Sequence, residues 1–503
     1  MPFYFFLSIS ILLFSACSNE KSGIVEHNNT STTIIKENHT TKEANNTVIA
    51  DNQAPKIKIK DDMVLYVKLN SIYTDPGAIA TDDKDKNISL SMQSNLDTSI
   101  EGTYNIVYRA TDSSGNISSA TRKVIVQNLP FIMLIDTKKD GNTSHKSFNI
   151  PIAPKQRYIY DVDCNNDGTP EATEITGSYT CNYEQEGRYT ISIKGEFPSI
   201  QFYQGKLDQH NSDSLKVIEI QQWGNIVWQT MYRAFYGCRN IHITATDTPD
   251  LGIVESMKEM FAHASSMNEN IEDWNVSNVQ NMSYTFRDAT HFNQSLAKWD
   301  VGKVNNMSYM FYNDIFFNQP LNDWNVSRTQ NMRGMFARTF SFNQPLNKWN
   351  TSKVHDMAQM FENAYNFDQP IGDWNVGRVL LMHSMFSYAK SFNQTLNKWN
   401  VSRVTSMRAM FNNAYNFDQD ISSWDTHRVR NTSYMFQSAR AFDQDISAWN
   451  MENVILIQSM FYAASAFYND LSSWNVSNTT NYSSFARYSP LEHESVLLPH
   501  FGQ

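Results

Sequence analysis

The C-terminal half of the sequence repeats one arrangement of apolar and polar residues every 25 residues. Trp and Phe each recur at this interval in nine consecutive units, at Trp274, Trp299, Trp324, Trp349, Trp374, Trp399, Trp424, Trp449 and Trp474, and at Phe261, Phe286, Phe311, Phe336, Phe361, Phe386, Phe411, Phe436 and Phe461. A period of 20–50 residues is typical of a solenoid, in which each unit buries its apolar face only against its neighbours. We therefore expect a solenoid over residues 257–478, with an N-terminal cap at 201–256 and a C-terminal cap at 479–503.

Each unit carries a helix-like spacing followed by a strand-like spacing. In one unit the spacing i, i+3, i+6, i+7 of a single helix face is occupied by Val304, Met307, Met310 and Phe311. Apolar and polar residues then alternate over residues 317–321, which favours a short strand, and Ser327 is placed as the N-cap of the next helix. One helix and one strand in 25 residues is the geometry of an α/β leucine-rich-repeat-like solenoid.

A polar residue before Gln also recurs with this period, at Asn293, Asn318, Asn343, Asp368, Asn393, Asp418 and Asp443. These side chains form either a stacked ladder that satisfies loop backbone or a row of exposed ligand groups, and we expect the ladder because repeated polar residues usually hold turns. The Trp and Phe rows are expected in the core. Binding is then expected at variable positions between them, such as Arg378 and His383.

The N-terminal half predicts two β-rich regions, at 54–127 and 128–200. Short alternating runs separated by turn residues are typical of a small β-sandwich. In the second region Cys164 and Cys181 lie 17 residues apart around an expected hairpin. A disulfide is the first interpretation in an exported protein, and two buried free thiols are the alternative. Cys238 falls at an apolar cap position and is expected to be a buried thiol. The predicted fold is thus multidomain, with N-terminal β-sandwich domains followed by the α/β solenoid.

One loop in the second region fits a calcium-binding pattern. Asp163, Asn165, Asp167, Gly168 and Glu174 match D-x-[DN]-x-[DN]-G-x5-E at every fixed position. Alternate oxygen ligands around a glycine turn suit Ca²⁺, but strands rather than helices flank the loop. An Asx/Gly turn in a hairpin is the alternative. No cofactor is expected to be required, and calcium is the one candidate ligand.

The first residues predict export. Residues 2–16 form an uncharged apolar run that is short for a membrane span and suits a signal peptide over 1–16. Residues 17–53 are rich in Asn, Thr, Lys and Glu and are expected to be a disordered tether. Ser15 and Ala16 directly before Cys17 resemble the lipobox of bacterial lipoproteins. That resemblance implies cleavage before Cys17, diacylation of its thiol and attachment to a membrane through the lipid.

The net charge and the absence of catalytic motifs reduce the number of function classes that the sequence allows. The formal net charge is -10, whereas a nucleic-acid binder usually shows a basic face, so no nucleic-acid partner is expected. The sequence has no Gly-x-Ser-x-Gly, His-Glu-x-x-His, P-loop or Gly-x-Gly-x-x-Gly motif, and an enzyme is not expected. Two alternatives stay open. One is a glycan-degrading surface enzyme, and the other is a structural protein of the envelope or biofilm.

Three further stretches resemble bacterial surface proteins. Residues 102–116 are similar to bacterial immunoglobulin-like domains, and residues 187–193 are similar to the last strands of PKD-like domains. The unit Met-x-x-Met-Phe-x-x-Ala-x-x-Phe-Asn-Gln-x-Leu-x-x-Trp-Asn-Val-Ser resembles the BspA-like surface repeats. This resemblance implies a leucine-rich-repeat relative on the cell surface or outer membrane that adheres to an extracellular protein or glycan. It carries over no ligand residues.

Overall fold

The structure is a computed structural model that describes residues 51–202 and 212–502 of the 503-residue chain. The described residues from Ala54 onward form one compact unit. The expected signal peptide, Cys17 and nearly all of the expected tether lie outside the described residues. No helix in the described part of the chain has the length and hydrophobicity needed to span a membrane.

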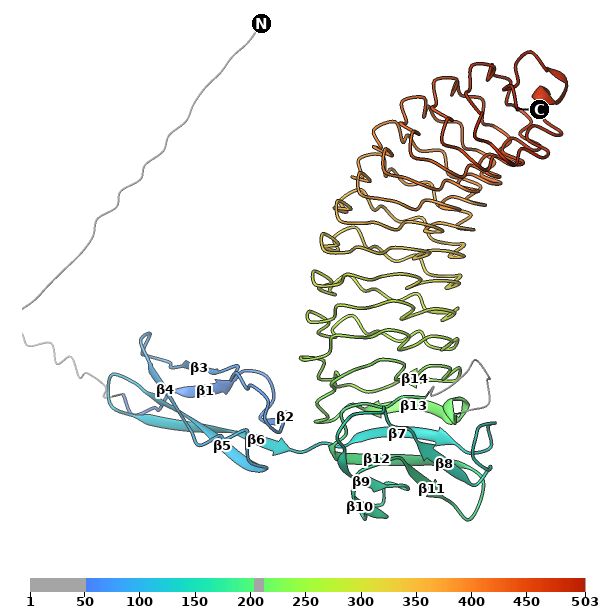
Figure 1. Cartoon of the computed structure of the whole chain (residues 1–503). Coiled ribbons are helices and arrows are strands. Elements are labelled where there is room, and N and C mark those ends of the chain that lie inside the picture. The colour runs from blue at the N-terminus through green and yellow to red at the C-terminus, as the bar shows by residue number, and fades with distance from the viewer. Residues whose placement is uncertain (1–50, 203–211, 503) are drawn as a thin grey trace, which may run out of the picture. The chain divides into compact units, whose positions relative to one another are not determined.

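The first β-region contains two sheets (Figure 1). Its strands are β1 (Lys56–Ile59), β2 (Val64–Lys68), β3 (Ala78–Thr81), β4 (Ser89–Ser94), β5 (Gly102–Thr111) and β6 (Ile117–Gln127). β1 pairs with β3, and the other sheet has the order β2-β6-β5-β4, with β2 parallel to β6. Inward-facing residues of the larger sheet form a small core of Val67, Ile106, Tyr108 and Val124.

The second β-region passes directly into the repeats. Its strands are β7 (Phe131–Asp136), β8 (Ser147–Ile150), β9 (Ile159–Asp163), β10 (Ala172–Ile175), β11 (Tyr179–Asn182), β12 (Arg188–Glu196), β13 (Val217–Gln222) and β14 (His242–Ile243). Six of them form one sheet in the order β10-β9-β12-β7-β13-β14, in which the last pair is parallel. Through this sheet a single hydrophobic core continues from Phe131 to Leu491.

The repeats form coils that stack on one another in sequence order (Figure 1, yellow to red). Parallel bridges of one residue join equivalent positions, as in Asn281 to Asn306 and Asn306 to Asn331. Every second N–H from position 307 to 313 donates to a carbonyl of the following coil, as Met307 does to Asn331 at 2.9 Å. The intervening N–H groups close tight turns within their own coil, as Met310 does onto Met307 at 3.2 Å.

The expected α/β solenoid is wrong, because the described residues contain no α-helix. The helical segments found there are two short 3₁₀ turns, η1 (Ser214–Lys216) and η2 (Pro490–His493). Two residues in each coil have positive φ, such as Tyr309 at 55° and Asn313 at 59°. An α-helix cannot contain such residues, and the N–H groups it would need already bond the next coil.

The expected strand and N-cap are also wrong. The single bridges fall at positions such as 306, ahead of the Met, and not within residues 317–321. Ser327 does not cap a helix. Its N–H donates to Asn325 Oδ1 at 3.2 Å, so the Asn closes an Asx turn. The chain is therefore built from open β-sheets and non-helical coils.

The prediction that the Trp and Phe rows lie in the core is confirmed. Every Phe of the row is fully buried and no Trp of the row is more than 5% exposed. Neighbouring rings in the Phe row stack, as Phe361 and Phe386 do with centroids 5.8 Å apart. Each Trp from 299 to 474 also donates its indole N–H to a carbonyl of the preceding coil, such as Trp374 to Leu346 O at 3.0 Å.

Replacing a central Trp should therefore break the stack at one point. We expect Trp374→Ala to cost about 3–5 kcal/mol, as for other buried aromatics, and to uncouple the coils on its two sides. Trp374→Phe keeps one ring but loses the bond to Leu346 and part of the buried ring surface, so it should cost less than Trp374→Ala, about 1–3 kcal/mol. Exposed Arg378→Asn in the same coil should change stability by less than about 0.5 kcal/mol. Denaturant unfolding of the three variants measures the order of these losses in the free energy of unfolding. An unchanged free energy of unfolding in Trp374→Ala would contradict the expectation.

One core position breaks the apolar pattern. Asp314 stands where most coils have Ala, is fully buried, and neither carboxyl oxygen has a hydrogen-bond partner among the described residues. Burial raises the pKa of this carboxyl well above its usual value. The folded state therefore holds a proton that the unfolded chain releases above about pH 4. Stability must fall as the pH rises through that range toward the raised pKa.

Asp314→Ala should consequently stabilise the protein at neutral pH, by about 1–3 kcal/mol, since it removes an unsatisfied buried group. The gain over the parent chain should shrink toward pH 4, below which the carboxyl is protonated in both states. Melting temperatures of the two proteins between pH 4 and pH 8 give the comparison. A gain that does not change with pH would show that the steric fit of the side chain, and not its titration, controls this position.

Candidate binding surface

The two cysteines of the second β-region are joined. Cys164 follows β9, Cys181 lies in β11, and their sulfur atoms are 1.92 Å apart with Cα atoms separated by 5.7 Å. Cys238 is free and fully buried, as expected, and burial raises the pKa of its thiol well above the usual value.

The calcium-like loop lies between β9 and β10 and is closed by its own side chains. Asp163 Oδ2 accepts the Gly168 N–H at 2.8 Å, and Asn165 Oδ1 accepts the Asp167 N–H at 2.9 Å. These bonds are those of the Asx/Gly turn. They bring Asp163, Asn165 and Asp167 together, whereas Glu174 takes part through its N–H, which donates to Asp161. Calcium binding by this loop stays a prediction.

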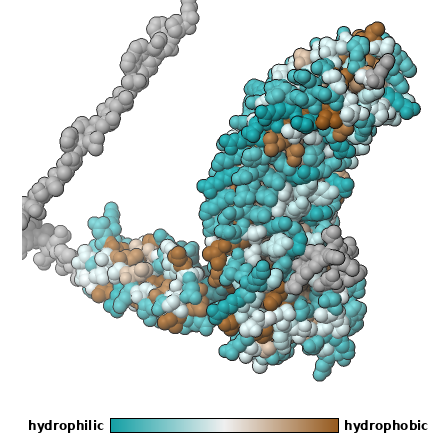
Figure 2. Space-filling view, in the orientation of Figure 1, coloured by the Kyte–Doolittle hydropathy of each residue, from teal (hydrophilic) through white to brown (hydrophobic). Residues whose placement is uncertain are grey.

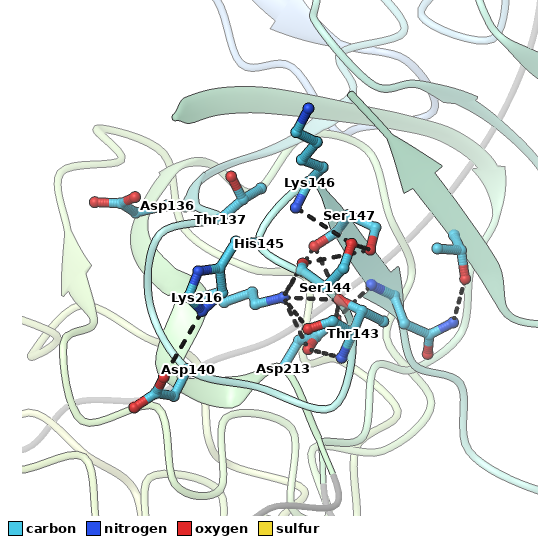
Figure 3. Close-up of polar contacts among 12 residues, drawn as sticks. Asp136, Thr137, Asp140, Thr143, Ser144, His145, Lys146, Ser147, Asp213 and Lys216 are labelled. Carbon is cyan, nitrogen blue, oxygen red and sulfur yellow. Dashed lines mark hydrogen bonds and ion pairs between the residues drawn. The ribbon is translucent and has the colours of Figure 1, made fainter. Parts of the chain in front are cut away.

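A buried ammonium group fastens the loop between β7 and β8 to the start of the repeats (Figure 3). Lys216 Nζ lies 2.7–3.0 Å from the carbonyls of Thr143, Ser144 and Ser147 and from the Thr143 hydroxyl, and 3.3 Å from Asp213 Oδ1. Both charged side chains are fully buried. A buried charge is tolerated when it is paired and hydrogen-bonded, so this cluster is structural.

The recurrent Asn and Asp residues form the stacked ladder, which confirms that prediction. The side-chain oxygen of each member accepts the backbone N–H of its equivalent one coil later, as Asn318 does from Asn343 at 3.0 Å. The same oxygen accepts the amide of the following Gln, here Gln344 Nε2 at 3.2 Å. Both bonds use only an oxygen, which explains why Asn and Asp alternate freely. We call these residues the Asn/Asp ladder.

Tyr and Arg side chains gather on a different part of each coil, at variable positions equivalent to 308–313. We call this set the tyrosine–arginine face: Tyr284, Arg287, Tyr309, Tyr312, Arg333, Arg338, Tyr388, Arg408, Tyr434, Tyr462, Arg487 and Tyr488. All are half-buried or exposed. Guanidinium groups lie over neighbouring rings, as Arg287 does 5.4 Å from the Tyr312 centroid and Arg408 does 5.3 Å from that of Tyr434.

The centre of this face is a hydrogen-bonded network across four coils. Arg333 Nε donates to Tyr309 Oη at 2.8 Å, and its Nη2 lies 3.2 Å from Gln359 Oε1 and 3.1 Å from His383 Nε2. Burial and the Arg333 guanidinium hold the pKa of His383 below its ordinary value. A neutral imidazole can accept from Arg333, so the network is fixed at neutral pH. The Tyr309 ring covers Gly334, whose missing Cβ would lie 2.3 Å from Cε1.

A shallow hollow of about 340 Å³ opens on the same face, lined by Glu362, Tyr388, Arg408 and Tyr434 among others. Burial raises the pKa of Glu362 despite an opposing hydrogen bond from Gln359. On the side of the coils that Figure 2 shows, the surface is mostly hydrophilic with scattered apolar residues. Sequence reasoning placed binding at variable positions and named His383, which is half-buried in this network. It did not find the face as a whole, although Tyr and Arg recur at fixed places in the 25-residue unit.

Comparison with known proteins defines the class and then the family. Residues 57–126 match the bacterial surface protein Ig-like domain, which places the chain among bacterial surface proteins that carry repeats. Residues 229–344, 317–414 and 394–494 match the family described as "Mycoplasma protein of unknown function, DUF285". Together these matches span more than half of the 503 residues, so the chain belongs to this family. The finer resemblance to BspA-like repeats is not confirmed.

Two other comparisons add little. No curated protein matches the chain. A solved structure of CBM51-2 in complex with GlcNAc and INT domains from Clostridium perfringens ZmpB is 14% identical, and the match covers 28% of this chain and 44% of that chain with a TM-score of 0.13. At this TM-score the likeness carries no argument.

The Asn/Asp ladder gives a test of its own geometry. Asn343→Asp keeps the accepting oxygen and should change stability by less than about 0.5 kcal/mol. Asn343→Ala leaves the Asp368 N–H and the Gln369 amide without their acceptor and should cost about 1–3 kcal/mol. Chemical denaturation separates the two variants, and equal losses would mean that the amide nitrogen, and not the oxygen, matters.

Proposed function

We propose that the chain is a surface-attached adhesion protein that binds an extracellular protein through the tyrosine–arginine face. One observation carries the proposal. The repeats keep their Phe, Trp and Met in the core, yet place Tyr and Arg repeatedly at half-buried or exposed positions of one region of the coil. Packing does not require these residues, because other coils have Ser, Ala or Asn at the equivalent positions, as at Ser384 and Asn413.

Tyr and Arg are the residues that contribute most to protein–protein binding. A Tyr ring supplies a large contact area at a small entropic cost, and a planar guanidinium forms bidentate bonds. The network of Tyr309, Arg333 and Gln359 fixes these groups before any partner arrives. Preorganisation of this kind raises affinity because less conformational entropy is lost on binding.

The rest of the chain fits the same role. The bacterial surface Ig-like domain indicates an extracellular location, and such β-domains are suited to hold the repeats away from the membrane. We propose lipid attachment at Cys17, a residue outside the described part of the chain. A binding role is also favoured over a glycan-degrading one, because the carboxylates at the face already have partners. Glu362 accepts a hydrogen bond from Gln359 Nε2 at 2.8 Å. Asp288 lies 3.2 Å from Arg287 Nε and Asp356 lies 3.6 Å from Arg333 Nη1, so both are ion-paired.

A triple variant tests the face without disturbing the coils. Tyr388→Asn, Arg408→Ser and Tyr434→Ser each introduce a residue that the chain uses at the equivalent position of another coil. Their combination should weaken retention of the full chain on extracellular-matrix-coated surfaces at least tenfold, since single interface Tyr and Arg residues often contribute 1–2 kcal/mol or more, as a rough guide. Surface plasmon resonance and cell-adhesion counts provide the measurement.

Matched exposed changes elsewhere, Ser423→Ala and Ser473→Ala, serve as controls and should leave retention unchanged. Protease treatment of the matrix should remove binding, because the proposed partner is a protein. Full retention by the triple variant with an unchanged melting temperature would reject the tyrosine–arginine face as the binding site and favour a structural role.

A further inference from the structure

A second row of side chains recurs with the 25-residue period and carries one sign of charge. In six consecutive coils the same position is occupied by Lys303, Arg328, Lys353, Arg378, Arg403 and Arg428. All six are exposed. We call them the basic ladder. It lies five residues before the first position of the tyrosine–arginine face in each coil and shares no residue with it.

These cations have no carboxylate partner in the part of the chain that the structure describes. Lys303 donates to the amide oxygen of Asn278, and Arg428 Nε lies 3.3 Å from His427 Nε2. No ion pair within 4.0 Å involves any of the six, and none belongs to the residues with further interactions. Asp300 and Asp425 precede the two end members by three residues, whereas neutral Asn325, Asn350 and Asn375 precede the central ones.

Cations at equivalent positions of successive coils repel one another. A neighbouring row of the same coils shows how the chain avoids this repulsion elsewhere. Asp273, Lys298, Asp323, Lys348, Asp373 and Lys398 follow one another at the 25-residue interval. They alternate in sign and pair across coils, with Nζ to Oδ1 distances of 2.8 Å for Lys298 and Asp273 and 2.7 Å for Lys348 and Asp323. We call this row the paired ladder.

The two rows differ in physical consequence. Bridged coils lie about 5 Å apart, so the six members of the basic ladder form a line of positive charge about 25 Å long. Like charges stacked directly opposite one another destabilise neighbouring strands. Asn278, Asn453 and Asn478 occupy the same position in other coils, so the fold does not require a cation there. A row that opposes folding and is not needed for it indicates a ligand that neutralises it.

We propose that the basic ladder is a binding site for an extended anionic polysaccharide that carries sulfate or carboxylate groups. The polymer lies along the axis of stacking, and its acidic groups meet successive coils. Arg forms paired N–H bonds with planar or tetrahedral oxyanions, and Lys supplies point charges. The exposed Asn side chains beside the central cations use their oxygens to close Asx turns, so they offer their amide N–H groups to sugar hydroxyls. This site goes beyond the proposed protein-binding face, because a different row with different chemistry carries it.

The surroundings favour a polysaccharide over a nucleic acid. Single-stranded nucleic acids are held by aromatic side chains interleaved with the cations. Each member of the basic ladder lies in a seven-residue stretch, from three residues before it to three after it, that contains no Phe, Tyr or Trp. Residues 325–331 are one example. Duplex DNA is read by elements that enter a groove, whereas this row consists of single exposed side chains, one from each coil.

The test uses the full chain and heparin as the probe. In the ladder variant, Lys353→Asn, Arg378→Asn and Arg403→Asn replace the central cations with the residue found at this position in other coils. We expect its Kd for heparin at 0.15 M NaCl to rise at least tenfold. The slope of log K against log salt should fall by roughly two to three, since each lost contact releases fewer counterions.

A control variant removes the same charge from the paired ladder through Lys298→Ser, Lys348→Ser and Lys398→Ser, with Ser taken from positions 423 and 473. It should bind heparin within twofold of the parent chain. The melting temperature of the ladder variant should equal or exceed that of the parent chain, because repulsion is relieved. This result also shows that the variant is folded.

Three results would overturn the proposal. Equal loss in both variants would mean that heparin senses only net charge. Duplex DNA of similar charge that binds as tightly as heparin, with the same loss in the ladder variant, would assign the row to nucleic acid. Unchanged heparin binding by a folded ladder variant would show that the basic ladder does not bind this polysaccharide. None of these bears on the tyrosine–arginine face, whose triple variant should keep heparin binding while losing matrix protein.

Discussion

The bonds between backbone groups of successive coils are the interaction on which the repeats depend. Each bridge joins residues 25 positions apart, as Asp356 joins Leu381, and the N–H groups that follow bond the next coil as well. A coil with one residue more or fewer would shift every later partner. Equal coil length is therefore a strict requirement, and the eight Trp intervals and eight Phe intervals of 25 in the sequence satisfy it.

Equal coil length brings every side chain close to its own equivalent in the next coil. Phe and Trp benefit, because identical rings stack and the indole N–H reaches a carbonyl. Asn and Asp benefit too, because one oxygen accepts two donors from the next coil. Charges do not benefit unless they alternate in sign, as Asp323 and Lys348 do. The physical question at each position is whether a residue tolerates a copy of itself about 5 Å away.

Much of the repeat structure could be predicted from the sequence, because the length of a coil and the burial of a position both show in the residue types that recur every 25 residues. The buried Trp row and the Asn/Asp ladder followed from register alone. The predicted helix was wrong, because the spacing of Val304, Met307 and Phe311 fits a helix and also fits tight turns that point apolar residues inward. The deciding signal was conformational. Asn313 and Gly334 occupy positions with positive φ, and Asn and Gly are the residues that adopt it most readily.

Binding residues are harder to predict for the same reason that the core is easy. Core positions repeat in identity, whereas Tyr309, Gly334, Gln359 and Ser384 are equivalent positions with different side chains. Their contacts run across coils, such as that from Tyr309 to Gln359 at 2.8 Å, two coils away. Such a network depends on which residues happen to be neighbours along the stack. The repeat thus separates two requirements: register constrains what lies inside, and leaves the outer positions free to vary with the partner.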